Sequence, residues 1–132
     1  MIFGIGTDIV RVARMSESLE RHGEKFARRL LTPEEFEDYQ RDARPAHFLA
    51  KRFAAKEAAV KALGTGFSGG LYPRHIGVTH DASGKPILVY LERAAELCSQ
   101  FGICASHLSI ADEEDHAVAF VTLVGTNAPG PT

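Results

Sequence analysis

The stretch FLAKRFAAKEAAVKALGTG, residues 48–66, is the most informative part of this chain for its architecture. Large apolar side chains recur in it at the spacing of one helical stripe: Leu49, Phe53, Val60 and Leu63. Most of the remaining positions are alanine, and Gly64 follows as the kind of residue that ends a helix. A helix that is apolar or small nearly all round is a buried one, so the stretch predicts a long central helix over residues 47–63.

Charged residues on this helix distinguish it from an ordinary core helix. They are Arg52, Lys56, Glu57 and Lys61. Burying a charge is costly unless the charge is paired or binds something. Glu57 and Lys61 lie one turn apart, and alanines on the same side, Ala50 and Ala54, leave room for a ligand or another chain. The alternative is an exposed Glu–Lys pair, which contributes only about 0.2–0.5 kcal/mol.

The sequence GTG at residues 64–66 follows this helix directly. Such a turn can direct backbone N–H groups and the Thr65 hydroxyl at a phosphate, although a helix end followed by a turn explains the same residues. Cations, a carboxylate and a glycine turn together indicate a metal-assisted phosphate site. A magnesium ion in such a site is well held by two carboxylates and substrate phosphates, so Glu57 needs a second carboxylate.

The sequence GIGTD at residues 4–8 supplies a candidate for that carboxylate. Residues 2–10 read as a strand, and because side chains alternate across a strand, Gly4, Gly6 and Asp8 share one face. Glycines weaken strands, and here they would leave a bare floor beside the carboxylate, which suits a bulky ligand or a metal ion. The alternative is that the glycines mark a bulge and that Asp8 caps the following helix.

The rest of the chain alternates between helix and strand patterns. Further helices are predicted over residues 11–22, after the start signal Thr32–Pro33–Glu35, and over residues 91–101, while 25–31 is a short basic and apolar segment. Two hairpins are predicted, 76–80 with 87–91 and 107–111 with 117–124. This order predicts an α+β fold in which an antiparallel sheet packs with the long central helix.

The composition is that of an ordinary globular domain. The 132 residues carry a net charge of −2, which argues against a general nucleic-acid binder. No apolar run approaches the ~18 residues of a membrane span, and no signal peptide is visible. Cys98 and Cys104 fit buried thiols in a reducing compartment. We expect a soluble, cytoplasmic protein with no membrane partner, one domain over residues 1–125 and a flexible tail over residues 126–132.

The chain resembles the holo-acyl-carrier-protein synthases in four segments. They are GIGTDIV at 4–10, RFAAKEAAVKALGTG at 52–66, GKP at 84–86 and HLSIAD at 107–112. These synthases are the short, single-domain 4′-phosphopantetheinyl transferases, and the resemblance implies their fold. It also implies their reaction in fatty acid biosynthesis, a part of lipid metabolism: the phosphopantetheine arm of coenzyme A moves onto a serine of apo-acyl carrier protein. Adenosine 3′,5′-bisphosphate is the other product, and Mg²⁺ is required.

The same resemblance assigns roles to individual residues. It implies that Asp8 and Glu57 hold Mg²⁺ and that Lys61 stabilises or protonates the leaving group. The implied coenzyme A contacts form a larger set: Arg52, Lys56, Lys61, Gly64, Thr65 and His107. The serine nucleophile belongs to the carrier protein, and either a water or a carboxylate acting through a water accepts its proton. Some members carry a second histidine after the His107 strand, where this chain has Asp112.

Two kinds of partner follow from the resemblance. The family docks its acidic carrier protein on the first helix, which favours a docking role for the recurring basic residues Arg14, Arg21, Lys25 and Arg28. A solvated face with intervening glutamates is the alternative. The family also forms homotrimers with active sites at subunit interfaces. The rival functions are a Mg²⁺-dependent transferase with another nucleotide donor and a non-catalytic trimeric domain that binds a phosphate or nucleotide.

Overall fold

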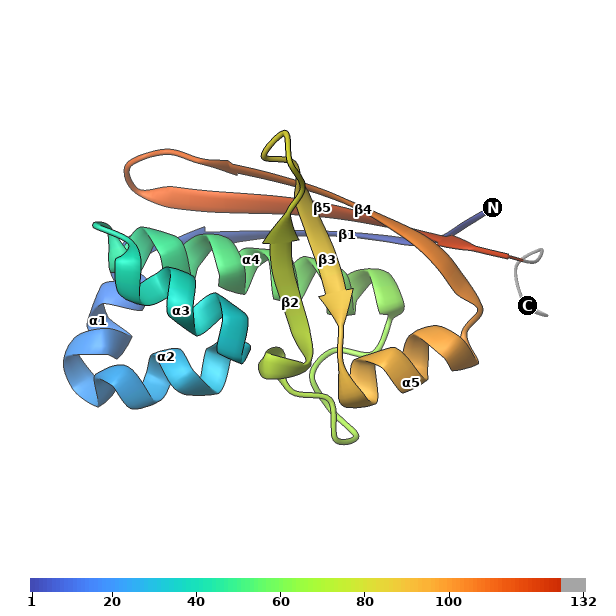
Figure 1. The fold of residues 1–132 in the computed structure, drawn as a ribbon, viewed down its shortest axis with the longest axis horizontal. Helices are drawn as coiled ribbons and strands as arrows, with labels where there is room; N and C mark the ends of the chain where they lie inside the picture. The colour runs from blue at the N-terminus through green and yellow to red at the C-terminus, as the bar shows by residue number, and fades with distance from the viewer. Residues whose placement is uncertain (127–132) are drawn as a thin grey trace.

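The computed structural model describes residues 1–126 of the chain (Figure 1). Its elements follow in the order β1 (Ile2–Arg11), α1 (Val12–His22), α2 (Glu24–Leu30), α3 (Pro33–Arg41), α4 (Pro45–Leu63), the 3-10 helix η1 (Pro73–His75), β2 (Ile76–His80), β3 (Pro86–Tyr90), α5 (Glu92–Gln100), β4 (Ile103–Asp112) and β5 (His116–Gly125). The predicted α+β fold with antiparallel strands is confirmed. Within the described residues, no helix combines the length and apolarity needed to cross a membrane.

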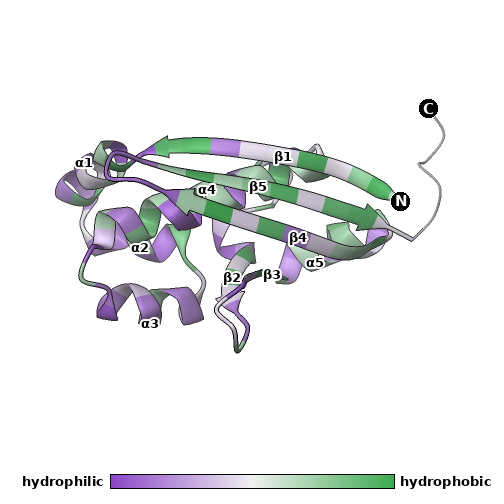
Figure 2. Ribbon diagram, turned by 90° about the horizontal axis from the view of Figure 1, so that it is seen from above, coloured by the Kyte–Doolittle hydropathy of each residue, from purple (hydrophilic) through white to green (hydrophobic). Residues whose placement is uncertain are grey.

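One long helix packs beneath one long sheet. The strands β1, β5 and β4 form a three-stranded antiparallel sheet in that order, and β2 pairs with β3 in a separate hairpin. Helix α4 runs along one face of the three-stranded sheet, against β1 and β5 (Figures 1 and 2). Helices α1–α3 gather toward one end of α4, while the β2–β3 hairpin and α5 lie toward the other end. The predicted central helix is therefore covered by several elements at once.

Helix α4 carries the centre of the hydrophobic core. Its alanines allow neighbouring elements to approach closely, and five of them are fully buried: Ala50, Ala54, Ala55, Ala58 and Ala59. Gly64 ends the helix in the left-handed conformation, with φ of 82°, as predicted. The helix begins at Pro45 rather than at residue 47. Proline suits the first helical position, because the N–H that it lacks has no partner inside the helix.

The two glycines of β1 face α4 rather than open space. A Cβ atom at Gly4 would overlap the carbonyl oxygen of Ala62, and a Cβ atom at Gly6 would overlap that of Ala58. The predicted bare floor for a ligand is therefore wrong at these two positions, because helix backbone fills the space. Glycine is needed here so that strand and helix can approach more closely than side chains allow.

The chain between β1 and α4 forms three helices. Gly23, with φ of 63°, separates α1 from α2, so residues 12–30 do not form one straight helix. Residues 25–30 of the short basic and apolar segment 25–31 belong to α2, and Leu31 is the C-cap of that helix. Thr32 and Glu35 form the predicted capping box at the start of α3: the Thr32 side chain accepts from the Glu35 N–H, and the Glu35 carboxylate accepts from the Thr32 N–H.

Strand β4 is longer than predicted. It begins at Ile103 rather than at residue 107, because its partner β5 continues to Gly125 and pairs with it over that length. Cys104 lies in this added part and is exposed, so the prediction of two buried thiols holds only for Cys98.

The predicted flexible tail falls almost wholly outside the described residues. Thr126, the first residue of that tail, donates its backbone N–H to the Gly102 carbonyl at 2.9 Å. Residues 127–132 are not described. The flexibility of this segment stays a prediction.

Candidate functional site

Asp8 and Lys61 meet where β1 packs on α4. Asp8 pairs in register with the buried residue Ala119, so its side chain points to the α4 side of the sheet. The Lys61 Nζ donates to Asp8 Oδ1 at 3.1 Å and to the Thr7 carbonyl at 3.0 Å. The Asp8 side chain is 17% exposed and that of Lys61 is 52% exposed, so a ligand can reach both. Asp8 does not cap α1, which begins after Arg11 without a side-chain hydrogen bond.

Glu57 lies one turn before Lys61 on the same helix. Burial raises the pKa of the Glu57 carboxyl above its ordinary value, and the nearby charge of Asp8 raises this pKa further. The cations Lys61 and Arg14 act on it in the opposite direction. Repulsion between Asp8 and Glu57 means that both carboxylates face the same small region. The structure thus brings together Asp8, Glu57 and Lys61, the three residues predicted to be catalytic.

This donor set fits a magnesium ion that relies on its substrate for further ligands. Among residues 1–126, no group of three or more His, Cys, Asp or Glu side chains is arranged to hold a metal ion. A bare pair of repelling carboxylates is stabilised by a divalent cation. Mg²⁺ typically binds one or two carboxylates and takes its remaining oxygens from water and phosphates. Asp8 and Glu57 match that pattern, whereas a transition metal would favour histidine or thiolate ligands.

The GTG turn after α4 is a helix cap rather than an open nest of N–H groups. The N–H groups of Gly64, Thr65 and Gly66 all point to the carbonyl of Val60, at 3.0, 3.2 and 3.4 Å. The predicted use of these N–H groups for a phosphate is therefore not supported. The Thr65 hydroxyl differs from them, because it is buried and has no hydrogen-bond partner within the described residues. It is the side-chain polar group of this turn that lacks a partner among residues 1–126, although its oxygen has almost no surface exposed to solvent.

Lys56 lies on another side of α4 and has no exposed surface. Its Nζ donates to Glu35 Oε1 at 2.6 Å, to the Pro73 carbonyl at 3.1 Å and to the Ile76 carbonyl. All three ammonium protons are therefore used inside the protein. Lys56 has neither a free donor nor surface for the phosphate contact that the resemblance implied.

Arg52 is placed beside the same carboxylate. Its Nε lies 3.3 Å from Glu35 Oε2, and its guanidinium stacks over the Phe48 ring at 4.4 Å from the centroid. Arg52 also lines a polar pocket together with Arg41 and Lys51. The structure does not bring Arg52 to the Asp8–Glu57 pair. In the sequence, Glu35 is recognisable only as a helix-start residue. No pattern in the residues around it predicts its pairing with cations on α4.

His107 points away from Asp8 and Glu57. In the sheet register His107 lies opposite Thr122, which lies opposite Ile5, so these three side chains share the outer face. The Asp8 row of the sheet points to the inner face, toward α4. Neighbouring positions on the outer face are apolar and exposed: Ile5 59%, Ile9 66%, Val118 37% and Phe120 48%. Within one chain, His107 is therefore separated from the carboxylate pair by the sheet itself.

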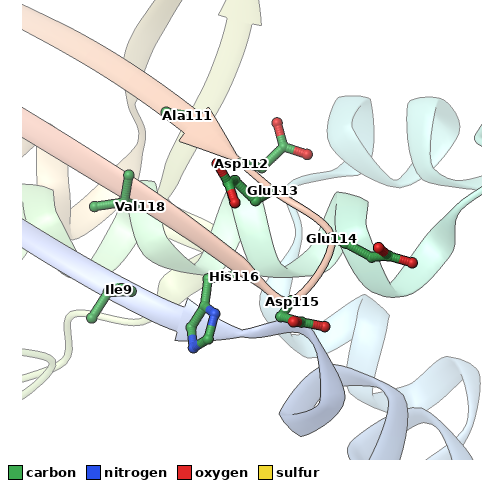
Figure 3. A pocket seen from close by; sticks show the side chains of 8 residues that line it. All are labelled: Ile9, Ala111, Asp112, Glu113, Glu114, Asp115, His116 and Val118. Carbon is green, nitrogen blue, oxygen red and sulfur yellow. The ribbon is translucent and has the colours of Figure 1, made fainter.

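An acidic pocket lies at the β4–β5 turn (Figure 3). Acidic side chains surround it, with apolar residues of the outer face at its edge: Ile9, Ala111, Asp112, Glu113, Glu114, Asp115, His116 and Val118. The turn is held by its backbone, because the Asp115 carbonyl accepts from the Val12 N–H at 2.8 Å. The pocket contains none of the predicted site residues.

The basic residues of α1 and α2 do not form one straight stripe, because Gly23 separates the two helices. The Arg14 guanidinium lies over the Phe53 ring, 4.9 Å from its centroid, and so close to Glu57 that it affects the Glu57 pKa. Arg28 is already paired with Glu24 at 2.8 Å. No ion pair involves Arg21 or Lys25 within residues 1–126, and both are exposed.

Comparisons with known proteins agree on one family. The profile of the 4′-phosphopantetheinyl transferase superfamily matches residues 4–121. A holo-[acyl-carrier-protein] synthase from Nitrosococcus oceani is 57% identical over 94% of this chain and 80% of its own length. One from Halorhodospira halophila is 53% identical over 94% of this chain and 98% of its own.

Solved structures give the same result. The crystal structure of a holo-[acyl-carrier-protein] synthase from Neisseria meningitidis matches with a TM-score of 0.89 and 46% identity, over 94% of this chain and 99% of that one. A synthase from Bacillus anthracis, solved in complex with coenzyme A (3′,5′-ADP), matches with a TM-score of 0.79 and 37% identity, over 96% and 99% of the two chains.

Proposed function

Because the chain belongs to the 4′-phosphopantetheinyl transferase superfamily, we propose that it transfers the 4′-phosphopantetheine group of coenzyme A to a serine of apo-acyl carrier protein. The products are the holo-carrier protein and adenosine 3′,5′-bisphosphate. The observation that carries the proposal is the half-exposed cluster of Asp8, Glu57 and Lys61 at the edge of the sheet–helix contact. The presence of both carboxylates, together with relatives named as synthases, argues against a non-catalytic binding domain.

The chain's own residues supply binding and charge stabilisation. The carrier serine oxygen forms a bond to the phosphorus that bears the pantetheine arm, the pyrophosphate P–O bond breaks, and the serine proton passes to a water or, through a water, to a carboxylate. Negative charge then develops on the departing bisphosphate, and the Lys61 ammonium stabilises it or gives it a proton. Asp8 and Glu57 would hold Mg²⁺, which when bound neutralises pyrophosphate oxygens and makes the phosphorus more electrophilic. The hydrogen bond from Lys61 to Asp8 keeps the ammonium beside that position at rest.

The phosphates of coenzyme A are proposed to contact two regions. Lys61, which is hydrogen-bonded to Asp8, suits the pyrophosphate, and the Thr65 hydroxyl beside Gly64 is proposed as a further phosphate contact. Arg52, whose pocket holds Arg41 and Lys51 together with the acidic Asp38 and Asp42, is proposed to contact a more distant phosphate of the same molecule. Arginine and lysine are the side chains most used for phosphate recognition.

A homotrimer with shared active sites is proposed from the position of His107. This residue contributes to a coenzyme A site only if it approaches the Asp8–Glu57 pair of a neighbouring copy, because the sheet separates it from its own. The apolar outer face around it supports such an arrangement, since exposed apolar patches commonly mark protein contacts. A trimer closes this head-to-tail contact without leaving a free end.

The carrier protein is proposed to dock on α1 and α2 through Arg14, Arg21, Lys25 and Arg28. Arg14 is the most informative of them, because it lies beside Phe53 and Glu57 and would bring an acidic partner next to the reacting phosphate. Arg21 and Lys25 are exposed and add attraction over a longer range. We place this activity in cytoplasmic fatty acid biosynthesis.

Intact mass spectrometry tests the function directly. An apo-carrier protein incubated with coenzyme A, Mg²⁺ and this protein should gain the mass of one phosphopantetheine. The variants Asp8→Ala and Glu57→Ala should remain folded and give no mass increase, whereas Glu96→Ala, an exposed glutamate on α5, should react normally. Absence of transfer to every fatty-acid and polyketide carrier tried would overturn the proposed function. Near-normal transfer by either carboxylate variant would overturn the metal assignment.

A further inference from the structure

A buried ion cluster lies on the side of α4 that faces away from the proposed catalytic residues. Glu35 is 1% exposed, Lys56 is fully buried and Arg52 is 5% exposed. Both carboxylate oxygens of Glu35 are used. Oε1 accepts from the Thr32 N–H and from Lys56, and Oε2 accepts from the Val78 N–H at 2.9 Å.

This cluster joins four elements at a single point. Glu35 belongs to α3 and Lys56 to α4, while the acceptors and donors around them belong to η1 and β2. A buried ion pair is costly in itself, and an apolar pair of similar volume is often as stable. Its retention in the protein centre therefore calls for a role that an apolar pair would not perform. Directional hydrogen bonds to fixed backbone groups can set the orientation of a helix, whereas apolar contacts tolerate rotation.

The position of Lys56 in the sequence connects this orientation to the proposed chemistry. Lys56 immediately precedes Glu57, and successive side chains on a helix point about 100° apart. Holding Lys56 toward Glu35, Pro73 and Ile76 therefore determines the direction of Glu57 and, one turn later, of Lys61. We propose that Glu35 and Lys56 are positioning residues, whose buried ion pair holds α4 in the rotation that presents Glu57 and Lys61 to Asp8.

The activity measurement for this inference rests on the proposed function. A double variant distinguishes a positioning role of Glu35 and Lys56 from a purely structural one. Lys56→Met and Glu35→Gln each leave one buried partner without the other, so either single variant is expected to be unstable. Glu35→Gln/Lys56→Met removes both charges of the pair but leaves the buried Arg52 beside an amide instead of a carboxylate, so it should recover part of the lost thermal stability. Arg93→Met/Glu96→Gln, which removes an exposed ion pair from α5, is the matched control.

The expected result is stability without activity. At a temperature where all proteins are folded, the double variant should keep its KM for coenzyme A within about threefold of the native value. Its kcat should fall about 10- to 100-fold, because a misplacement of about 1 Å costs up to about 100-fold in rate. The control pair should change neither quantity. Recovery of kcat together with stability would show that the pair only stabilises the fold and would overturn the proposal.

Amide hydrogen exchange gives a second measurement that does not need activity. The double variant should exchange faster than the native protein at residues 57–63, where α4 carries Glu57 and Lys61, and at 73–78, which the cluster also holds. Strand β5 should be unaffected. If the native protein transfers nothing to any carrier, the proposed function fails, and exchange alone decides the positioning role. Native-like exchange over 57–63 in the double variant would overturn it.

Discussion

Helix α4 carries two clusters of opposite charges that differ in almost every physical respect. Glu35, Lys56 and Arg52 are buried, and all protons of Lys56 have acceptors inside the protein. Asp8, Glu57 and Lys61 are half-exposed. In this second cluster the two carboxylates repel one another, Asp8 shares Lys61 with the Thr7 carbonyl, and Lys61 and Arg14 both act to lower the pKa of Glu57. The first cluster is complete, and the second has unused capacity for a cation and for phosphates.

The difference shows that residue type alone does not identify a ligand site. Each cluster joins a carboxylate from another element to charged residues of α4, and the family resemblance assigned both Lys56 and Lys61 to coenzyme A. Satisfaction of hydrogen bonds and exposure separate them. A lysine whose donors are all used in the core is a structural or positioning group, and a lysine that can exchange a partner for a ligand is a candidate for catalysis.

Stability provides the largest expected contrast between the clusters. Lys56→Met should lower the free energy of unfolding by about 3–5 kcal/mol, because it leaves the buried Glu35 carboxylate with Arg52 as its remaining cation and takes the donor from the Pro73 and Ile76 carbonyls. Lys61→Met should lower it by less than about 1 kcal/mol, because the Asp8–Lys61 pair is partly exposed to solvent. Urea unfolding followed by circular dichroism measures both. Equal losses in the two variants would show that the buried and the exposed cluster contribute equally to stability.

Activity should show the reverse contrast at Lys61. Lys61→Met is expected to lower kcat about 10²- to 10³-fold, or about 2.7–4 kcal/mol in the barrier, because one preorganised charge is removed from the leaving group. Carrier modification followed by mass spectrometry gives the rate, and Arg93→Met on α5 controls for loss of an exposed cation. A variant with native kcat would exclude Lys61 from the chemistry.

A smaller effect is expected at the Thr65 hydroxyl, four residues after Lys61 in the chain. Thr65→Val keeps the shape of the side chain but removes the hydroxyl that has no partner within residues 1–126. If that hydroxyl binds a coenzyme A phosphate, the KM for coenzyme A should rise about three- to tenfold, which corresponds to about 0.5–1.5 kcal/mol for one hydrogen bond. Thr79→Val on β2 is the control. An unchanged KM would show that the Thr65 hydroxyl does not contact this substrate.

The smallest expected effect concerns the sign of a stability change. The pKa of Glu57 is raised in the folded protein, so its charge opposes folding at neutral pH. Glu57→Gln should therefore raise Tm slightly at pH 7. The matching gain in the free energy of unfolding should be less than about 1 kcal/mol, because the site is partly exposed. The gain should shrink as the pH falls through the raised pKa and vanish below the ordinary carboxyl pKa. A lower Tm at pH 7 would mean that Glu57 is stabilised by its neighbours instead.

Patterns within short stretches of sequence were the reliable part of the prediction. The all-round apolar character of residues 47–63 identified the buried helix, and strand alternation placed Gly4, Gly6 and Asp8 on one face of the first strand. The Thr32–Glu35 capping box was also found locally. These features depend on neighbours a few residues away, and the sequence displays such neighbours directly.

Contacts between distant segments were the part that the sequence could not supply. Glu35 pairs with a lysine 21 residues away, and no spacing rule links a helix-start glutamate to the middle of a later helix. The glycines of β1 were read as space for a ligand because strand alternation reveals which face they occupy but not what covers that face. In the structure, the covering group is the backbone of α4.

The fit of Gly4 and Gly6 against α4 also bears on how mutational libraries of this protein should be read. Any side chain at these positions collides with a main-chain carbonyl, which cannot move aside as a flexible side chain can. A saturation library screened only for folded protein should therefore recover glycine at both positions, even with catalysis left out of the selection. Asp8, two residues after Gly6, should accept many substitutions in that same screen. Those substitutions should disappear only from a library that is also selected for phosphopantetheine transfer. Failure to replace Gly4 or Gly6 would thus indicate a packing requirement. Positions that tolerate substitution in the folding screen but not in the transfer screen would be those needed for catalysis.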